Sequence, residues 1–317
     1  MQIRLARPAY SFISVFSEMS DATVIRQPSK ARGPRAFAVA PLIVLPLLAL
    51  PLLHRVPPWA FMWLMAIALF LGFKWLTFAT SHAPTAPLWI QLLYLTAWPG
   101  LAPDEFIRPL PRSRRPSRSD WFPPSLNLVT GLLLVILVAP QMATPLLRGW
   151  AGMIGTILVL HFGTFHLLAL ALRTLGLDAR PLMLQPLRSG SLAEFWGQRW
   201  NTAFAALAGR HAFRPLARKL GARHAIAIVF VGSGLIHEAV ITVPAGGGYG
   251  LPTLFFGLQA LGMGLERHRT ISERPKIRRA LAWLFLIAPL GCLFPPVFVE
   301  RVILPMLDSI HSFLTTP

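Results

Sequence analysis

A histidine and a glutamate interrupt a stretch of the sequence that is otherwise strongly apolar. His237 and Glu238 lie in the run 225–243, which is otherwise suited to cross a membrane. An ionisable side chain at that depth costs on the order of 2.5 kcal/mol or more unless it faces protein or water. A histidine that titrates near neutral pH can act as a general base in a water-accessible pocket. The pair is therefore the first candidate for chemistry, and a histidine packed between helices is an equally open interpretation.

The residues around His237 indicate how a helix would present it. Ser233 lies four residues earlier on the same helix face, so its side chain could hydrogen-bond the imidazole. Gly232 and Gly234 predict the close approach of a neighbouring helix. Glu238 lies about 100° further round the helix, so the two ionisable groups need not face one cavity.

Asn201, in the sequence QRWN, is the second candidate. An amide is not a base at pH 7, but it can orient a reactant or stabilise a developing oxyanion. The alternative interpretation is a polar residue on a helix face that contacts lipid headgroups.

Other ionisable residues also fall at predicted membrane depth. Lys74 is expected to extend its ammonium group to the cytoplasmic surface, with a substrate contact as the alternative. His161 and His166 are five residues apart, so they do not share one helix face as an i, i+4 metal pair would. We expect these two histidines to be structural or to line a cavity. With a single cysteine, Cys292, and no HExxH, P-loop or GxSxG motif, neither a metal site nor a bound cofactor is predicted.

The composition is that of an integral membrane protein. Of the 317 residues, 54% are hydrophobic and only 13% are charged, with a mean hydropathy of +0.57. Soluble domains carry roughly 25% charged residues. The net charge of +18 could suggest nucleic-acid binding. However, the basic residues lie between the apolar runs, which favours membrane orientation and anionic lipid as a partner and predicts no nucleic-acid partner.

The apolar runs predict an all-α polytopic bundle, because a membrane-spanning helix needs roughly 20 mainly apolar residues. The run 87–98 is too short and is expected to be re-entrant or interfacial, while 302–314 is expected to be amphipathic or a short last span. We expect roughly seven to nine transmembrane helices. They would form one membrane-embedded domain at 36–317, preceded by a flexible basic tail at 1–35. The candidate spans are 36–53, 58–80, 124–143, 150–172, 225–243, 250–265 and 280–299.

The basic segments predict the orientation of this bundle. Arg and Lys residues gather in 1–35, 101–123, 173–223 and 266–279. Placing all of these segments on the cytoplasmic side satisfies the positive-inside rule. The preference for Arg over Lys, together with abundant Ala and Pro, favours a bacterial source and hence the inner membrane.

The segment 173–223 is too apolar and too rich in Trp to be a linker, and we expect amphipathic helices in it. Ser191 and Glu194 fit a capping box, which predicts that a helix begins there. Such a helix would lie in the interface, with its Trp side toward lipid or the bundle. Its polar stripe would comprise Glu194, Gln198, Asn201 and Ala205, and its apolar face Trp196, Trp200, Ala203, Phe204 and Leu207.

Both candidate residues lie in blocks that resemble those of a known family. The stretches PLRSGSLAEFWGQRWN (186–201) and IVFVGSGLIHE (228–238) resemble two motifs of the wax synthase branch of the membrane-bound O-acyltransferases. Asn201 and His237 lie 36 residues apart, a spacing similar to that of the family. The stretch YLTAWPGLAP (94–103) is similar to an upstream segment of bacterial members.

The resemblance, which is closest over 160–265, implies an activity and a set of residue roles. It implies transfer of a fatty acyl group from acyl-CoA, a co-substrate, to the hydroxyl of a long-chain alcohol or another lipid acceptor. His237 matches the catalytic histidine of the family and Asn201 its characteristic asparagine, whereas Gln198 stands where Arg or Lys is common. The residues expected to contact substrate are Arg188, Trp196, Arg199, Trp200, Ser233 and Glu238, with Arg180 and Arg214 as further possible partners of the CoA phosphates.

Two rival functions remain open at this point. An acyltransferase for another acceptor, such as diacylglycerol, a sterol, a glycan or a polyketide hydroxyl, would carry the same motifs. A non-enzymatic transporter or lipid-binding protein would use His237 as a proton relay. That class predicts inverted repeats and charged residues in several spans, and both signals are weak here. The sequence does not indicate an oligomeric state.

Overall fold

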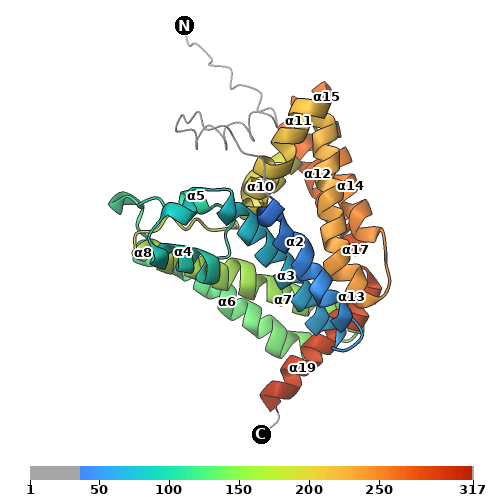
Figure 1. The fold of residues 1–317 in the computed structure, drawn as a ribbon. Helices are drawn as coiled ribbons and strands as arrows, with labels where there is room; N and C mark the ends of the chain where they lie inside the picture. Colours follow the sequence, from blue (N-terminus) through green and yellow to red (C-terminus); the bar gives the residue numbers. More distant parts are fainter. Residues whose placement is uncertain (1–35, 316–317) are drawn as a thin grey trace.

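The computed structural model describes residues 36–315, and this part of the chain is mainly helical and contains no β-strand. The predicted all-α class is therefore confirmed, while the predicted basic tail lies outside the described residues. Figure 1 shows two helix pairs whose members lie side by side. These pairs are α2 (Ala36–Ala49) with α3 (Pro58–Ala79), and α12 (Ala222–His237) with α14 (Leu251–Leu265).

Several long helices change to a wider π-helical turn along their length. The central ones are α6 (Phe122–Leu133) followed by Leu134–Val138, and α7 (Pro145–Ile157) followed by Leu158–Thr164 and α8 (Phe165–Thr174). The remaining short helices are α4 (Leu88–Leu92) with the π-turn Leu93–Ala97, α5 (Pro103–Phe106), α11 (Arg214–Leu220), α13 (Val243–Ala245), α15 (Arg269–Ser272), α17 (Leu290–Leu293) and α18 (Pro296–Phe298).

Most of the predicted spans appear as helices of membrane-crossing length. Those long and apolar enough are Pro58–Ala79, Arg112–Gln141, Pro145–Thr174 and Ala222–Ala245, which contain or closely match the predicted spans 58–80, 124–143, 150–172 and 225–243. The predicted spans 36–53 and 250–265 are also helical, but Ala36–Leu52 and Leu251–Leu265 are shorter apolar helices. The protein is therefore a polytopic membrane protein, and the total number of crossings stays a prediction.

The predicted span 280–299 is wrong in its boundaries. The structure instead places two helical stretches there, Pro275–Leu293 and Pro296–Thr315, bent by 54° at the break between them. Pro295 and Pro296 explain the position of the break, because proline has no N–H to donate and disfavours helical geometry in the residue before it. The first stretch begins with α16 (Pro275–Ile287), and the second ends with α19 (Leu304–Thr315).

Lys74 in α3 is buried, which contradicts the prediction that it extends to the membrane surface. Its exposed fraction is 1%. The ammonium nitrogen Nζ donates to the carbonyl oxygens of Trp98 at 2.6 Å and Gly100 at 2.5 Å. It also lies 3.4 Å from the centroid of the Tyr94 ring, a favourable cation–π contact. Lys74 thus satisfies carbonyl groups where the short apolar helix Leu88–Ala97 ends.

Asp104 in α5 links the turn after α3 to the segment that follows α10 (Thr202–Ala208). Its Oδ2 accepts a hydrogen bond from Nη2 of Arg210 at 2.9 Å, and its Oδ1 accepts one from the main-chain N–H of His82, also at 2.9 Å. Burial by itself raises the pKa of Asp104, but these hydrogen bonds outweigh it and hold the pKa below its ordinary value. The region around Lys74 is therefore tied to residue 210, beyond Asn201 in the chain.

The substitution Lys74→Met tests whether the buried ammonium stabilises the fold. We expect a loss of about 1–3 kcal/mol, because the buried Trp98 and Gly100 carbonyls lose their donor. Thermal unfolding in detergent measures the change. The matched control is Lys276→Met, at an exposed lysine, which should stay within about 0.5 kcal/mol of the wild type. Equal unfolding temperatures for the two variants would contradict the assignment.

Candidate active site

His237 is held in one orientation by the helix that carries it. It is the last residue of α12, and a π-helical turn, Glu238–Thr242, follows directly. The ring nitrogen Nδ1 lies 2.7 Å from the main-chain oxygen of Ser233. A carbonyl oxygen can only accept, so Nδ1 must carry the hydrogen. In the neutral ring, the lone pair is therefore on Nε2, which is the atom that can take up a proton.

The surroundings of His237 match part of what the sequence predicts. Ser233 contacts the imidazole as expected, but through its main-chain oxygen rather than its hydroxyl. A Cβ added to Gly234 would lie 2.6 Å from the Cα of Thr253, so the close approach of α12 and α14 at this residue is confirmed. Gly232 has no atom within 4 Å of such a Cβ, and the predicted close approach there is wrong. Its hydrogen side chain meets open space.

Glu238 binds the beginning of α14. Its Oε1 accepts hydrogen bonds from the main-chain N–H of Thr253 at 3.1 Å and from the Thr253 hydroxyl at 3.0 Å. Its Oε2 accepts one from the hydroxyl of Thr242. The first N–H groups of a helix have no partner within the helix and attract negative charge. Both carboxylate oxygens are engaged in this way, which favours a structural role for Glu238 over the expected substrate contact.

The predicted start of the helix at Ser191 is confirmed. The Ser191 hydroxyl accepts a hydrogen bond from the N–H of Glu194 at 3.0 Å, and α9 (Leu192–Glu194) follows. The reciprocal half of the predicted capping box is wrong. The carboxylate of Glu194 accepts from the N–H of Gly190 at 2.7 Å, one residue further back than Ser191.

The predicted continuous helix through Asn201 is also wrong, and so is its single polar stripe. After α9 the chain forms the π-helical turn Phe195–Arg199 and becomes extended at Trp200. Asn201 has a φ of 44°, in the left-handed region, which Asn tolerates better than most residues. A separate helix, α10 (Thr202–Ala208), then begins. Periodicity could not reveal this break, because an i, i+4 pattern assumes unbroken helical geometry.

Asn201 caps α10, and this fixes the orientation of its amide. Oδ1 accepts a hydrogen bond from the N–H of Phe204 at 3.2 Å. The main-chain N–H of Asn201 points to the sulfur of Met183 at 3.3 Å. Among the described contacts none uses Nδ2, so the NH₂ group of the amide keeps both of its hydrogens for a ligand.

An aromatic cluster joins the segment of Asn201 to His237. The ring of Trp196 lies 5.6 Å from that of Phe256 on α14, and the Phe256 ring lies 4.5 Å from that of His237. Trp200, the residue before Asn201, stacks on Phe195 at 5.5 Å with an interplanar angle of 12°. The described contacts therefore connect His237, through Phe256, to Trp196 on the segment that precedes Asn201.

The arginines expected to bind substrate differ in how much of their charge is available. Nη2 of Arg199 lies 2.6 Å from Glu194, and its Nη1 donates to the carbonyl of Leu184 at 3.1 Å. These bonds favour a structural role for Arg199. Arg180 likewise pairs with acidic side chains, Asp178 at 3.2 Å and Glu105 at 3.3 Å. Arg188, by contrast, is exposed at the start of the motif.

A cavity of about 380 Å³ lies beside α10. Gln198 and Thr202, which flank Asn201 in the sequence, are on its wall, together with the acidic residues that hold Arg180. Trp98 and Gly100, the residues bound by Lys74, form another part of the wall. The cavity therefore combines neutral polar groups with paired charges beside the Asn201 turn.

Gln259 on α14 and Glu266 just after its end are two polar residues whose role in this region was not predicted from the sequence. Gln259 is 0% exposed, and its Oε1 accepts from the indole N–H of Trp196 at 3.3 Å. Glu266 is 6% exposed, and its Oε1 accepts from the N–H of Leu192 at 2.6 Å. Burial raises the pKa of Glu266 despite that bond. Both residues interrupt or end an apolar run, and that was the signal available to find them.

The other histidines at membrane depth are His161 and His166. His161 lies in the π-helical turn after α7, and its buried Nδ1 has no hydrogen-bond partner. His166 lies on α8. Within residues 36–315, no group of three or more His, Cys, Asp or Glu side chains is placed to hold a metal ion. The structural or cavity-lining role expected for these histidines stays a prediction.

The role of Glu238 is testable by comparing two substitutions. Glu238→Leu should lower stability by about 1–3 kcal/mol, because the N–H of Thr253 loses its acceptor. Glu238→Gln keeps an oxygen acceptor of the same reach and should remain close to the wild type. Thermal unfolding of both variants in the same detergent gives the comparison. If Glu238→Leu were as stable as Glu238→Gln, the carboxylate would not be a helix cap.

Comparison with known proteins finds a family match over the segment that contains Asn201 and His237. The model of the membrane bound O-acyl transferase family matches residues 179–258. A long-chain-alcohol O-fatty-acyltransferase of Simmondsia chinensis is 30% identical over 148 residues, which is 42% of each chain. A probable long-chain-alcohol O-fatty-acyltransferase 7 of Arabidopsis thaliana is 28% identical over 144 residues, or 40% of this chain and 42% of the relative.

The match spans less than half the length of each of these relatives. It nevertheless includes the α9–α10 break with Asn201, the whole of α12 and the first half of α14. This segment is therefore similar to the membrane bound O-acyl transferase family.

Proposed function

We propose that this protein transfers a fatty acyl group from acyl-CoA to the hydroxyl of a long-chain alcohol and so forms a wax ester. The observation that carries the proposal is the Nδ1–H to Ser233 hydrogen bond, which leaves Nε2 of His237 as the basic nitrogen. The names of the similar plant proteins support the long-chain alcohol as the acceptor. Acyl-CoA acts as a co-substrate, and no further cofactor or metal is required.

In the proposed reaction, His237 serves as the general base. Its Nε2 accepts the hydroxyl proton while the alcohol oxygen bonds to the thioester carbonyl carbon. The tetrahedral intermediate then collapses, the carbon–sulfur bond breaks, and CoA leaves as a thiolate that recovers the proton from the imidazolium. A thiolate is a good leaving group, so a single base is sufficient for the reaction.

Asn201 is proposed to stabilise the oxyanion that forms on the thioester carbonyl. Its Oδ1 is held by the N–H of Phe204, so the amide is fixed in orientation and its NH₂ group is not used by the cap. A preorganised donor of this kind acts without reorganising during the reaction, and its loss typically costs about 10²–10³ in rate.

We propose that the basic segments, including 173–223, face the cytoplasm, where acyl-CoA is available. The Arg-rich composition supports placement in the cytoplasmic membrane of a bacterium. Arg180 and Arg199 are held in ion pairs, whereas Arg188 is exposed and makes no ion pair among the contacts described for residues 36–315, so we propose that Arg188 binds the CoA phosphates.

The direct test supplies membranes that contain the protein with labelled acyl-CoA and a long-chain alcohol, and detects wax ester by mass spectrometry. His237→Ala should abolish ester formation. The matched control is His224→Ala, because the Nδ1 of His224 makes the same kind of bond, to Leu220 at 2.9 Å, on the exposed start of the same helix. Activity of His237→Ala at the wild-type protein level would exclude the general-base role. Diacylglycerol and a sterol, offered as alternative acceptors, test the rival substrate classes.

A second substitution separates the chemical role of Asn201 from its role as a helix cap. Asn201→Asp keeps an oxygen acceptor for the N–H of Phe204 and suits a helix N-terminus, so the fold should persist. It removes the NH₂ donor, and we expect the rate to fall by about 10²–10³. Steady-state rates are normalised to folded protein measured by thermal unfolding. A variant with full activity would show that Asn201 serves only as a cap.

A further inference from the structure

The side chain of Gln259 joins three parts of the fold that are distant in sequence. It is fully buried on α14. Its Nε2 donates to the main-chain oxygen of Phe285 on α16 at 2.6 Å, and its Oε1 accepts from the indole N–H of Trp196 at 3.3 Å. The side-chain amide of Gln259 therefore connects α16 to the segment that precedes Asn201.

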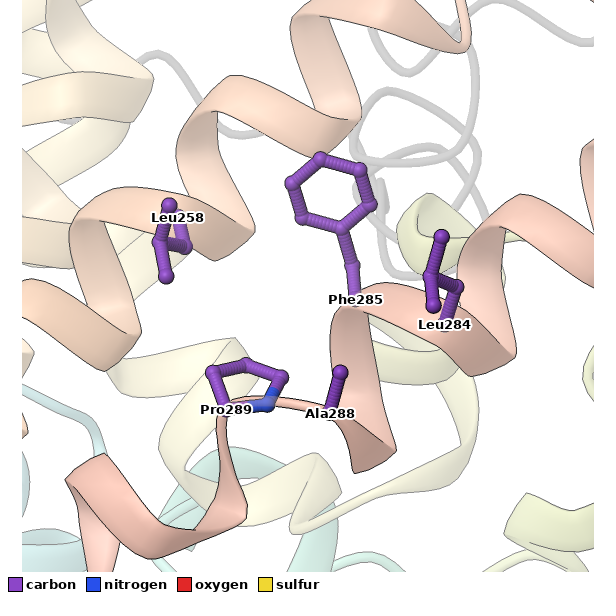
Figure 2. Close-up of a pocket in the computed structure, with 5 residues that line it drawn as sticks. All are labelled: Leu258, Leu284, Phe285, Ala288 and Pro289. Atoms are coloured by element: carbon purple, nitrogen blue, oxygen red, sulfur yellow. The ribbon is translucent and has the colours of Figure 1, made fainter.

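A proline explains why the amide is oriented in this way. In a regular helix the oxygen of Phe285 would accept from the N–H of residue 289, but that residue is Pro289 and has no N–H. Figure 2 shows Pro289 where the helix that carries Phe285 ends, beside an apolar hollow of about 310 Å³. The buried carbonyl needs a donor, and Gln259 supplies it. With Nε2 engaged there, only Oε1 remains for Trp196.

The Trp196 ring in turn contacts the residue that packs on the catalytic candidate. Its centroid lies 5.6 Å from that of Phe256, one helical turn before Gln259 on α14. The Phe256 ring lies 4.5 Å from the His237 ring. Close packing in a protein interior transmits small displacements, so the rotation of Trp196 affects the space left for the imidazole.

We propose that Gln259 is a positioning residue, which holds Trp196 so that Phe256 keeps the His237 ring in its reactive orientation. The inference rests on the proposed general-base role of His237. Gln259 does not touch the reacting atoms and acts only through the two aromatic rings. The hydrogen bond from Nδ1 to Ser233 fixes one end of the imidazole, and the Phe256 contact limits its tilt.

The arrangement of α14 supports this assignment. Thr253 binds Glu238 at the start of the helix, and Glu266 binds Leu192 just beyond its end. Between these ends, a Cβ added to Gly262 would lie 2.5 Å from the side chain of Leu192, so the helix also touches the motif segment closely. α14 is thus fixed at both ends, one to the helix of His237 and the other to the segment of Trp196, with Gln259 between them.

The test is a double-mutant cycle between Gln259→Leu and Trp196→Phe, assayed for wax ester with acyl-CoA and a long-chain alcohol. Each single variant removes the bond between the two side chains. We expect either change to lower kcat by about ten- to a hundredfold through misplacement of the base, with KM for both substrates unchanged. The double variant should be no slower than the slower single variant, because both changes remove the same connection.

A matched control separates this effect from general loss of packing. Trp63→Phe removes an indole N–H that also bonds a buried side chain, the sulfur of Met306 at 3.4 Å, between α3 and α19. It should change thermal stability without lowering kcat per folded protein. Gln259→Leu with a normal kcat per folded protein, a rise in KM alone, or additive losses in the double variant would each overturn the positioning role. Absence of ester with the wild-type protein would instead refute the proposed function itself.

Discussion

The structure depends on one constraint, that main-chain groups exposed at helix breaks inside an apolar bundle must find partners within the protein. Many helices of residues 36–315 are interrupted, at prolines, at π-helical turns and at the left-handed residue Asn201. A break leaves N–H or carbonyl groups without a partner in the helix, and an apolar interior supplies no water to bind them. Polar side chains supply partners for these main-chain groups. Lys74 donates to the carbonyls of Trp98 and Gly100. Glu238 accepts from the N–H of Thr253, and Gln259 donates to the carbonyl of Phe285.

This constraint separates the polar residues that build the site from those that are left for chemistry. The charged groups of Glu238, Arg199 and Glu266 form hydrogen bonds to other groups of the protein. His237 uses Nδ1 to bind a main-chain oxygen, and its Nε2 is not used by that bond. Asn201 uses Oδ1 to bind a main-chain N–H, and its Nδ2 is not used by that bond. A side chain with one polar atom bonded to the main chain is held in one orientation, while its second polar atom can still bind or react with a substrate. That is the condition a preorganised catalytic group must meet.

Sequence reasoning located the candidate residues but not the reasons for their geometry. Apolar runs and the position of His237 are local signals, and the helix that carries His237, Ala222–Ala245, was predicted to within three residues at each end. The break at Asn201 was missed because a left-handed residue leaves the hydrophobic periodicity on either side intact. The roles of Lys74, Gln259 and Glu266 were missed because their partners are distant in sequence. The pairing of Gln259 with the carbonyl before Pro289, for example, depends on how α14 packs against α16.

The partner of the imidazole sets what kind of base His237 can be. In many hydrolases a carboxylate orients the histidine and stabilises the positive charge that forms on it. Here the neighbouring carboxylate, Glu238, is turned toward α14, and a neutral carbonyl, that of Ser233, takes the orienting position. The imidazolium therefore receives less electrostatic support, and proton transfer to it is harder. An acyl donor with a thiolate leaving group suits such a site, since its expulsion needs little acid assistance from the histidine.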